Sequence, residues 1–444
     1  MYTIYKYLNQ SIGIAPLATF RVLFGVMMLF SVIRFALNGW IYDLYIKPEF
    51  LFPYFGFEWL PRPSEFMLYG LFGIMAVSAL FIALGFIYRV ASISFFLAFT
   101  YIEFLDKTNY LNHYYFVSLI AFLLIFLPAN RIYSVDVWLK PNIKVSHVPR
   151  WTVGILRFQV GLVYLMAGIA KLNYDWLFRA MPLKTWLAAR TDLPLIGWLF
   201  DYSFAPFVFS WAGAAFDLFI VFFMLNKNTQ KWGYVVIVIF HLLTSYLFNI
   251  GVFPIVMITS ALIFFLAETH QKWWNYFGSI FRLNKCIEVI HYQENKASKV
   301  LNFLLLSVYL IIQVIMPFRY VFYPGNLFWT EQGYRFSWRV MLMEKGGAAT
   351  FHVIERNTGK SIEVTNTDFL TPYQEKMMAT QPDMILQFAH YLKKEYENRG
   401  MTNPKITTDC YVALNGRASR KLIDSTIDIG NEEDGFSHKT WILN

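Results

Sequence analysis

The sequence contains few charged residues: only 15% of its 444 residues are Asp, Glu, Lys or Arg, whereas roughly a quarter of the residues in a soluble domain are charged. The shortage is uneven, because residues 66–130 and 205–268 carry almost no charge while residues 331–444 have the composition of a soluble domain. This contrast excludes a wholly soluble protein. It predicts a membrane-embedded region followed by a domain outside the membrane.

Cysteine is equally scarce. The two cysteines, Cys286 and Cys410, provide no disulfide framework, and the topology described below places them on opposite sides of the membrane. The eight histidines show no metal-ligand spacing, and no glycine-rich phosphate-binding loop occurs. We therefore expect no metal site. The formal net charge of +9 is scattered over loops rather than gathered in a basic stripe, so nucleic acid is not expected as a partner.

Long hydrophobic runs are what the sequence has instead, and 57% of its residues are hydrophobic. About twenty consecutive apolar residues cross a bilayer as a helix, because lipid offers the backbone no other hydrogen-bond partner. The expected fold is a membrane all-α bundle of about nine transmembrane helices with a β-rich extramembrane C-terminal domain. The predicted spans are residues 16–36, 66–86, 90–105, 112–130, 151–170, 205–225, 232–249, 252–268 and 301–318.

The orientation follows from the basic residues of the loops. If the N-terminus is cytoplasmic, more Lys and Arg residues fall on the cytoplasmic segments than on the outer ones, as the positive-inside rule favours. An odd number of spans then places the C-terminal domain outside. We expect two domains, a transmembrane domain at residues 1–318 and an extramembrane domain at residues 319–444, with membrane lipid as a partner.

The C-terminal domain shows a different pattern. Residues 335–364 alternate polar and apolar side chains, with turn signals at 346–347 and 357–359, which predicts strands joined by hairpins. The second half of residues 369–397 has one apolar face and predicts a helix. Residues 405–416 alternate again and predict a further strand.

Ionisable side chains at membrane depth are costly, so they are candidates for function. The first such cluster lies in a short turn between two predicted spans, FLDKTNYLNHYYF at residues 104–116, and it contains Asp106, Lys107, Asn112 and His113. Buried polar groups need partners. This cluster therefore forms either the wall of a polar cavity or a water-facing turn.

The second cluster is YLMAGIAKLNYDW at residues 164–176, where Lys171 ends a predicted span. The small residues Ala167, Gly168 and Ala170 permit close packing against another helix. A lysine in a low-dielectric pocket can be a neutral base. Alternatively, the side chain extends to the interface and only anchors the helix end.

The third cluster is FHLLTSYLFNIGVFP at residues 240–254. His241, Thr244 and Ser245 share one helical face by their spacing of three and four residues. They form either a substrate pocket or hydrogen bonds between helices. Asp217, a lone acid within a predicted span, needs a partner on another helix.

The fourth cluster is residues 317–345, which run from the last predicted span into the first predicted strands. Arg319, Arg335 and Arg339 could recognise a carboxylate by the fork geometry of their guanidinium groups. They could equally anchor the domain to lipid headgroups.

Three of these stretches resemble motifs of the vitamin K-dependent γ-glutamyl carboxylases. LDKTNYLNHYYF resembles that family's LDKTxxxNHxY signature, and YLMAGIAKLNYDW resembles the AGxxKLxxDW segment that carries its catalytic lysine. FHLLTSYLFNIGVF resembles FHxxxSxLFxIGxF. Shorter similarities cover nearly the whole chain, and GYRFSWRVML resembles the start of the family's lumenal domain. The basic, cysteine-poor composition is typical of a bacterial homologue.

The resemblance implies an enzyme whose substrates are vitamin K hydroquinone or another reduced quinone, O₂, CO₂ and a glutamate-containing peptide or protein. In that family a neutral lysine deprotonates the hydroquinone, and reaction with O₂ yields a base that removes a γ-proton from glutamate before CO₂ adds. The quinone leaves as its epoxide. Carried over, the catalytic residues are Lys171 and His113. The substrate-binding candidates are Asn112, His241, Asp106, Thr108, Ser245, Arg335 and Arg339.

Two other functions are weighed against this one. A quinone-binding or transport protein without carboxylase activity would also place polar groups in a membrane bundle, although transporters commonly contain internal repeats and none is found here. A membrane-anchored binding module would leave the clusters around His113 and Lys171 unexplained. For the enzyme we expect a multi-pass protein of a bacterial inner membrane, with the C-terminal domain on the periplasmic or lumenal side.

Overall fold

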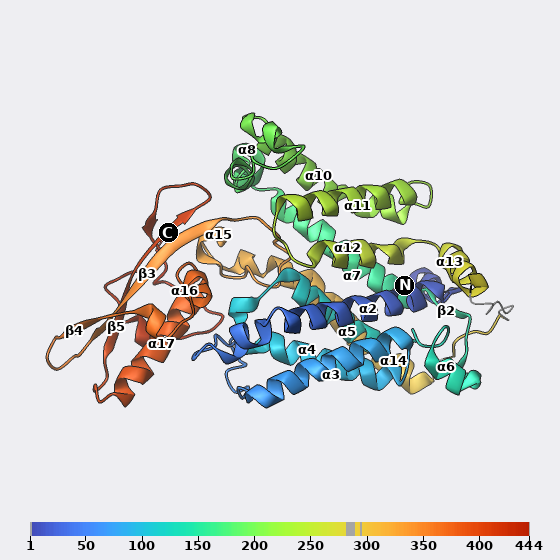
Figure 1. Cartoon of the computed structure of the whole chain (residues 1–444), viewed down its shortest axis with the longest axis horizontal. Helices are drawn as coiled ribbons and strands as arrows, with labels where there is room; N and C mark the ends of the chain where they lie inside the picture. Colours follow the sequence, from blue (N-terminus) through green and yellow to red (C-terminus); the bar gives the residue numbers. More distant parts are fainter. Residues whose placement is uncertain (1, 281–288, 294, 444) are drawn as a thin grey trace.

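Figure 1 shows long helices that run side by side and a small sheet that lies beyond one end of the helical bundle. The computed structural model describes residues 2–280, 289–293 and 295–443 of the chain. Cys286, which the sequence placed across the membrane from Cys410, lies outside these residues. The thiol of Cys410 is free and buried.

The part of the chain before the sheet is helical. Its helices are α1 (Tyr2–Leu8), α2 (Ala15–Leu37), α3 (Glu65–Leu84), α4 (Tyr88–Leu105), α5 (Asn112–Phe126), α6 (Val135–Leu139), α7 (Arg150–Lys171), α8 (Tyr174–Arg179), α9 (Leu183–Ala188), α10 (Ala205–Leu225), α11 (Gln230–Leu247), α12 (Phe253–Ala261), α13 (Ala267–Ile280) and α14 (Lys296–Ile315). Two short strands, β1 (Ser11–Gly13) and β2 (His147–Pro149), pair antiparallel at the end of the bundle away from the C-terminal sheet (Figure 1).

Six helices of the described residues are long and apolar enough to cross a membrane. They are α2, α3, α4, α7, α10 and the stretch Lys299–Phe322, which contains most of α14 and the short 3-10 helix after it. These helices coincide with six of the predicted spans. The chain is therefore a multi-pass membrane protein.

The predicted count of about nine spans is not confirmed. Helix α5 is apolar but has only 15 residues, or about 22 Å of helix, because Leu127 is extended before Pro128. Helix α11 is not among the six. The span predicted over residues 252–268 is broken, since the helical pieces Phe253–Phe264 and Ala267–Tyr276 are bent by 109° and make a seventh span only if counted together.

A side chain from another helix stabilises this break. A helix end leaves its last carbonyl groups without partners. Arg157 of α7 donates from Nε to the carbonyl of Ile263 at 2.9 Å, and from Nη2 to the carbonyls of Phe264 and Phe265 at 3.0 Å each. These bonds replace the helical bonds lost at the bend. A partner about a hundred residues away leaves no trace in the local hydrophobic pattern, which is why the sequence predicted one continuous span.

The C-terminal region contains a four-stranded antiparallel sheet in the order β4-β3-β5-β6. Its elements are α15 (Leu327–Thr330), β3 (Lys345–Ile354), β4 (Ser361–Val364), α16 (Pro372–Met378), α17 (Pro382–Asn398), β5 (Lys405–Leu414) and β6 (Arg420–Lys421). Phe351 and Val353 of β3 are buried with Phe388 and Leu392 of α17. The predicted helix and its apolar face are thus confirmed.

The predicted strands are only partly correct. The turn at 357–359 joins β3 to β4, as expected. The turn predicted at 346–347 is wrong, because both glycines lie inside β3. Residues 335–344 form no strand, because Phe336, Trp338 and Met341 have φ angles of 61°, 59° and 55°, and the left-handed region breaks an alternating pattern.

Candidate active site

Lys171 is the last residue of α7, at the end of the bundle near the C-terminal domain. Its side chain is buried, and its Nζ lies 2.6 Å from Oδ2 of Asp217 in α10. Gly168 lets the two helices approach, because a Cβ there would lie 2.7 Å from the backbone nitrogen of Leu218. The close packing predicted for the small residues is confirmed, and the lone acid Asp217 has Lys171 as its partner.

These two groups line a cavity of about 310 Å³ between α7, α10, α11 and α12, which we call the lysine cavity. Most of its wall is apolar, with aromatic rings such as Phe209, Phe240 and Phe253. Val340 and Met341 complete the wall from the segment that precedes β3. The membrane bundle and the chain after its last span therefore enclose the cavity together.

His241 and Tyr164 form a second polar pair in the lysine cavity. Nε2 of His241 lies 2.9 Å from the Tyr164 hydroxyl, and the buried Nδ1 has no hydrogen-bond partner among the described residues. Thr244, one turn further along α11, also lines the cavity. Ser245 is exposed and lies outside it. The structure therefore brings Lys171 and His241 together and leaves Ser245 apart.

His113 is buried at the start of α5, but it does not line the lysine cavity. The centroid of its ring lies 5.9 Å from that of Phe253, which in turn lies 5.7 Å from the ring of His241. Asn112 donates from Nδ2 to the backbone carbonyl of Arg339 at 3.1 Å. His113 thus contacts a residue of the cavity wall, and Asn112 contacts the residue that precedes Val340 of that wall.

Asp106 and Thr108 lie in the turn between α4 and α5, against the C-terminal domain. The Asp106 carboxylate accepts hydrogen bonds from the backbone nitrogens of Thr108 at 2.9 Å and Phe52 at 3.3 Å, and from the Gln374 side chain at 3.4 Å. Burial raises the pKa of Asp106 to about 6, although these bonds act in the opposite direction. The carbonyl of Thr108 accepts a bond from Tyr373. This turn therefore fastens the bundle to the C-terminal domain.

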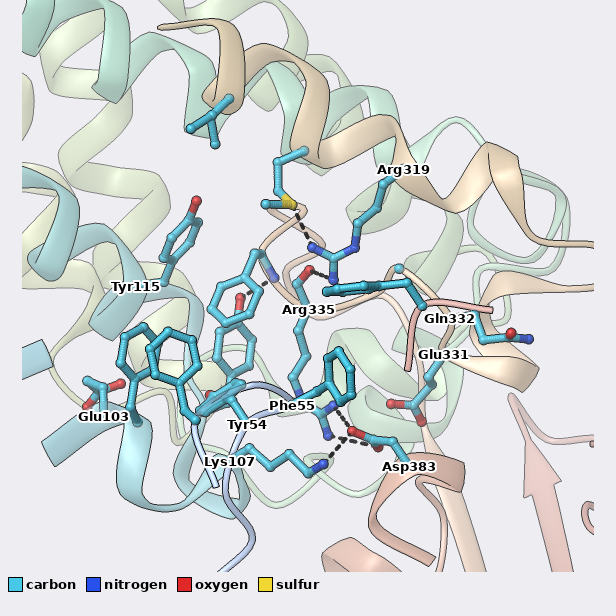
Figure 2. Close-up of a pocket in the computed structure, with 18 of the residues that line it drawn as sticks. Tyr54, Phe55, Glu103, Lys107, Tyr115, Arg319, Glu331, Gln332, Arg335 and Asp383 are labelled. Carbon is cyan, nitrogen blue, oxygen red and sulfur yellow. Dashed lines mark hydrogen bonds and ion pairs between the residues drawn. The ribbon is translucent and has the colours of Figure 1, made fainter. Parts of the chain in front are cut away.

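A larger cavity of about 610 Å³ opens at the same junction (Figure 2), and we call it the junction cavity. In its wall, Oδ2 of Asp383 lies 2.9 Å from Nζ of Lys107 and 2.6 Å from Nη1 of Arg335. Burial alone would raise the pKa of Asp383, but the charges of Arg335 and Lys107 hold it well below its usual range. The three groups form an ion cluster between bundle and domain.

Arg339 is not among the residues that line either cavity. Its guanidinium carbon is 4.4 Å from the centroid of the Tyr320 ring, and its Nε has no hydrogen-bond partner among the described residues. Arg335 lines the junction cavity, whereas Val340 and Met341 line the lysine cavity. The segment 335–341 therefore separates the two.

Two protein-family models match the chain. The HTTM domain matches residues 9–269, and the vitamin K-dependent gamma-carboxylase, lumenal domain, matches residues 298–444. The chain belongs to the vitamin K-dependent γ-carboxylase family. No solved structure matches it. Membership gives this carboxylase homologue a carboxylase-like function and makes vitamin K the cofactor that the family implies.

The lysine cavity of this carboxylase homologue fits a reduced quinone. A quinol has a flat ring, an apolar body and two hydroxyl oxygens, and the cavity offers aromatic walls with few polar groups. The unpartnered Nδ1 of His241 is the most specific observation, because a buried polar atom requires a partner and a quinol oxygen would provide one. Lys171 and Asp217 line the same cavity as His241.

The sequence did not reveal two residues of these sites. In the sequence, Asp383 is an ordinary acid in the first turn of a helix. Only the burial of Lys107 indicates that this lysine needs an acidic partner, and the sequence does not show that burial. Tyr164 precedes Lys171 by seven residues, a spacing that places both on one face of α7 and could have indicated it. In the part of the chain that the structure describes, no group of three His, Cys, Asp or Glu side chains could hold a metal ion.

Proposed function

We propose that the protein is a membrane carboxylase that couples oxidation of a reduced quinone by O₂ to the addition of CO₂ at the γ-carbon of a peptide glutamate. Family membership supports this function. The observation that carries it is the buried pair of Lys171 and Asp217 in the wall of an apolar cavity. We also propose that residues 319–444 lie on the periplasmic or lumenal side of a bacterial inner membrane, where an acceptor peptide would approach.

Lys171 is the proposed base, and it can accept a proton only as a neutral amine. Its contact with Asp217 provides a place for the ammonium proton. The Lys171–Asp217 pair has two states, an ammonium beside a carboxylate and a neutral amine beside a carboxylic acid. In a low-dielectric site the neutral state comes close to the ionic state in free energy, because two buried ions lose their hydration. Transfer of the proton from Nζ to Oδ2 across 2.6 Å leaves the amine free to take a proton from a quinol hydroxyl.

When bound, a reduced quinone would supply, with O₂, the base that removes the γ-proton of glutamate. The chain's own residues orient the ring and exclude water. The Tyr164 hydroxyl can donate a hydrogen bond to Nε2 of His241. In that tautomer the imidazole proton is on Nδ1, which can donate a hydrogen bond to a quinol oxygen. The apolar wall keeps out water that would otherwise protonate a strong base.

The remaining candidates act at a distance from the lysine cavity in this proposal. His113 and Asn112 are positioning residues, since they contact Phe253 and the backbone of Arg339. Asp106 and Thr108 hold the C-terminal domain in place. For Arg335 and Arg339 we propose contact with the acceptor carboxylate.

The test is an assay of the purified full-length protein in detergent with reduced vitamin K, labelled bicarbonate and a glutamate-containing peptide. Labelled peptide and quinone epoxide are measured together. Lys171→Ala should form neither product, whereas Lys184→Ala, which removes an exposed lysine of α9, should form both at the wild-type rate. Activity of Lys171→Ala equal to that of Lys184→Ala would exclude Lys171 as the base.

The same assay, combined with a measurement of quinol binding, distinguishes the second candidate function. The pairing of Lys171 with Asp217 also suits a quinone-binding protein in which the lysine stays protonated. Quinol binding without epoxide or labelled peptide, for each quinol supplied, would favour that function. Epoxide without labelled peptide would retain the quinol reaction and exclude peptide glutamate as the acceptor.

A further inference from the structure

Helix α7 begins at the end of the bundle where β2 lies, away from the C-terminal sheet (Figure 1). Its first two turns carry two arginines without carboxylate partners among the described residues. Arg150 is the first residue of α7, and Arg157 follows two turns later, so both side chains lie on one face of that helix. Among the described residues, the ion pairs formed by arginine involve neither of them. Both belong to a candidate span, where a cation is costly unless other groups compensate its charge.

Each arginine has hydrogen-bond donors to spare. The guanidinium carbon of Arg150 lies 4.3 Å from the centroid of the Tyr7 ring, and its buried Nε has no partner among the described residues. Arg157 uses Nε and Nη2 on the carbonyls of the bend after α12. Its Nη1 makes no hydrogen bond within residues 2–280, 289–293 and 295–443. A guanidinium presents its donors in a fork that matches two oxygens of a phosphate.

Two hollows meet at these arginines. One has a volume of about 320 Å³ and a mixed wall that includes the polar side chains of Ser11, His147 and Glu268. We call it the polar hollow because the wall of the other is almost wholly apolar. The other is an apolar groove of about 400 Å³ between α7 and α10. Residues lining the groove include Phe158, Leu162, Leu165, Val221, Phe222 and Leu225. Arg150 and Arg157 line both hollows, so the cationic groups lie where the polar hollow passes into the groove.

We propose that this Arg150–Arg157 site binds one phospholipid, with its phosphodiester on the two guanidinium groups and an acyl chain in the groove. Basic pockets between transmembrane helices bind lipid headgroups in this way. Phe222 and Leu225 of the groove are exposed on a candidate span, so the groove is open to the lipid around the bundle. Free phosphate carries no chain to fill a groove with this lining.

The polar hollow also restricts the headgroup. Glu268 lies in its wall, and its carboxylate would repel a second phosphate group. The site is therefore suited to a lipid with a single phosphate. Because Arg157 also holds the carbonyls at the bend after α12, bound lipid would stabilise that break.

Native mass spectrometry of the detergent-purified full-length protein tests the site, with phosphatidylglycerol as the probe. The wild type should retain one lipid per chain. Arg150→Gln should weaken binding roughly tenfold, as expected for the loss of a charge-assisted hydrogen bond. Arg89→Gln is the matched control, because Arg89 is an exposed arginine at the start of α4 that lines neither hollow. It should bind like the wild type.

A second variant tests the groove without removing a charge. A Cβ added at Gly154, which lines the groove, would meet no atom within 4 Å. Gly154→Leu should therefore fold normally, fill the groove and weaken lipid binding. The proposal is overturned if the wild type retains no lipid, or if Arg150→Gln binds like Arg89→Gln. It is also overturned if inorganic phosphate displaces the lipid and Gly154→Leu binds normally, because the site then recognises phosphate alone.

Discussion

Asp383→Asn tests how the C-terminal domain is held on the membrane bundle. The side chain of Asp383 joins Lys107, which is 3% exposed, to Arg335, which is 14% exposed, while Asp383 itself is 33% exposed. Removing one partner of a fully buried pair costs about 3–5 kcal/mol, because the other charge is left uncompensated. Solvent screens part of this cluster, so we expect a loss of about 2–3 kcal/mol.

The pH dependence of this contribution has a definite sign. The cations hold the pKa of Asp383 below its ordinary value of 3.8. A group whose pKa is depressed on folding contributes stability that is complete above its unfolded pKa and is lost as the pH falls toward its folded pKa. The contribution of Asp383 is therefore constant at neutral pH and declines only below about pH 4. Asp383→Asn should remove this decline.

Hydrogen exchange in detergent micelles is the appropriate assay, because undocking of the domain should expose the amides of residues 106–112 and 334–341. A loss of about 2–3 kcal/mol accelerates their exchange roughly 30- to 150-fold. Asp409→Asn is the control, since Asp409 pairs with Lys421 at 3.0 Å but is 44% exposed. Equal exchange in Asp383→Asn and Asp409→Asn would refute the reasoning and show that solvent screens the cluster completely.

Two further predictions concern single carboxyl groups. Asp217→Asn removes the acceptor for the Lys171 proton and should slow quinol epoxidation roughly hundredfold, the lower end of general-base contributions; an unchanged rate at saturating quinol would show that Asp217 only fills space. Burial raises the pKa of Asp106 to about 6, so ionisation of Asp106 lowers the free energy of unfolding. This destabilisation is absent below about pH 4 and complete above about pH 6. Asp106→Asn should therefore raise the thermal unfolding midpoint more at pH 7.5 than at pH 4.5, and equal shifts would contradict the assigned burial.

The six spans could be predicted because their cause is local. A run of about twenty apolar residues has no alternative to a helix in lipid, whatever lies beside it. The length of α5 also has a local cause, since Leu127 is extended before Pro128, although the predicted span extended to residue 130. The break after α12 depends on Arg157 and could not be predicted from the run itself.

The sequence could indicate which residues belong to the candidate site, but it could not predict which of them contact the cavity. His241, Thr244 and Ser245 lie within about 100° of one another around α11, so the sequence could place them on one stripe. The cavity borders only one side of that stripe, which includes Thr244 and leaves Ser245 exposed. Which side is buried depends on how α11 packs against its neighbours.

The segment 335–341 shows how tertiary contacts override a local pattern. Left-handed backbone at a non-glycine residue costs on the order of 1 kcal/mol, so Phe336 and Trp338 must be held by other groups. The backbone nitrogen of Phe336 donates to the Tyr110 hydroxyl at 2.8 Å. The buried Trp338 ring stacks on Tyr115, with centroids 4.8 Å apart.

These anchors, together with the bond from Asn112 to the carbonyl of Arg339, all come from the turn before α5 and its first residues. That stretch is one of the motifs that resembles the carboxylases. Its polar residues lie outside the lysine cavity, yet they fix the segment whose Val340 and Met341 close it. In our proposal a motif residue such as Asn112 therefore acts through the backbone of a segment more than two hundred residues away. Neither stretch of sequence, taken alone, predicts this contact.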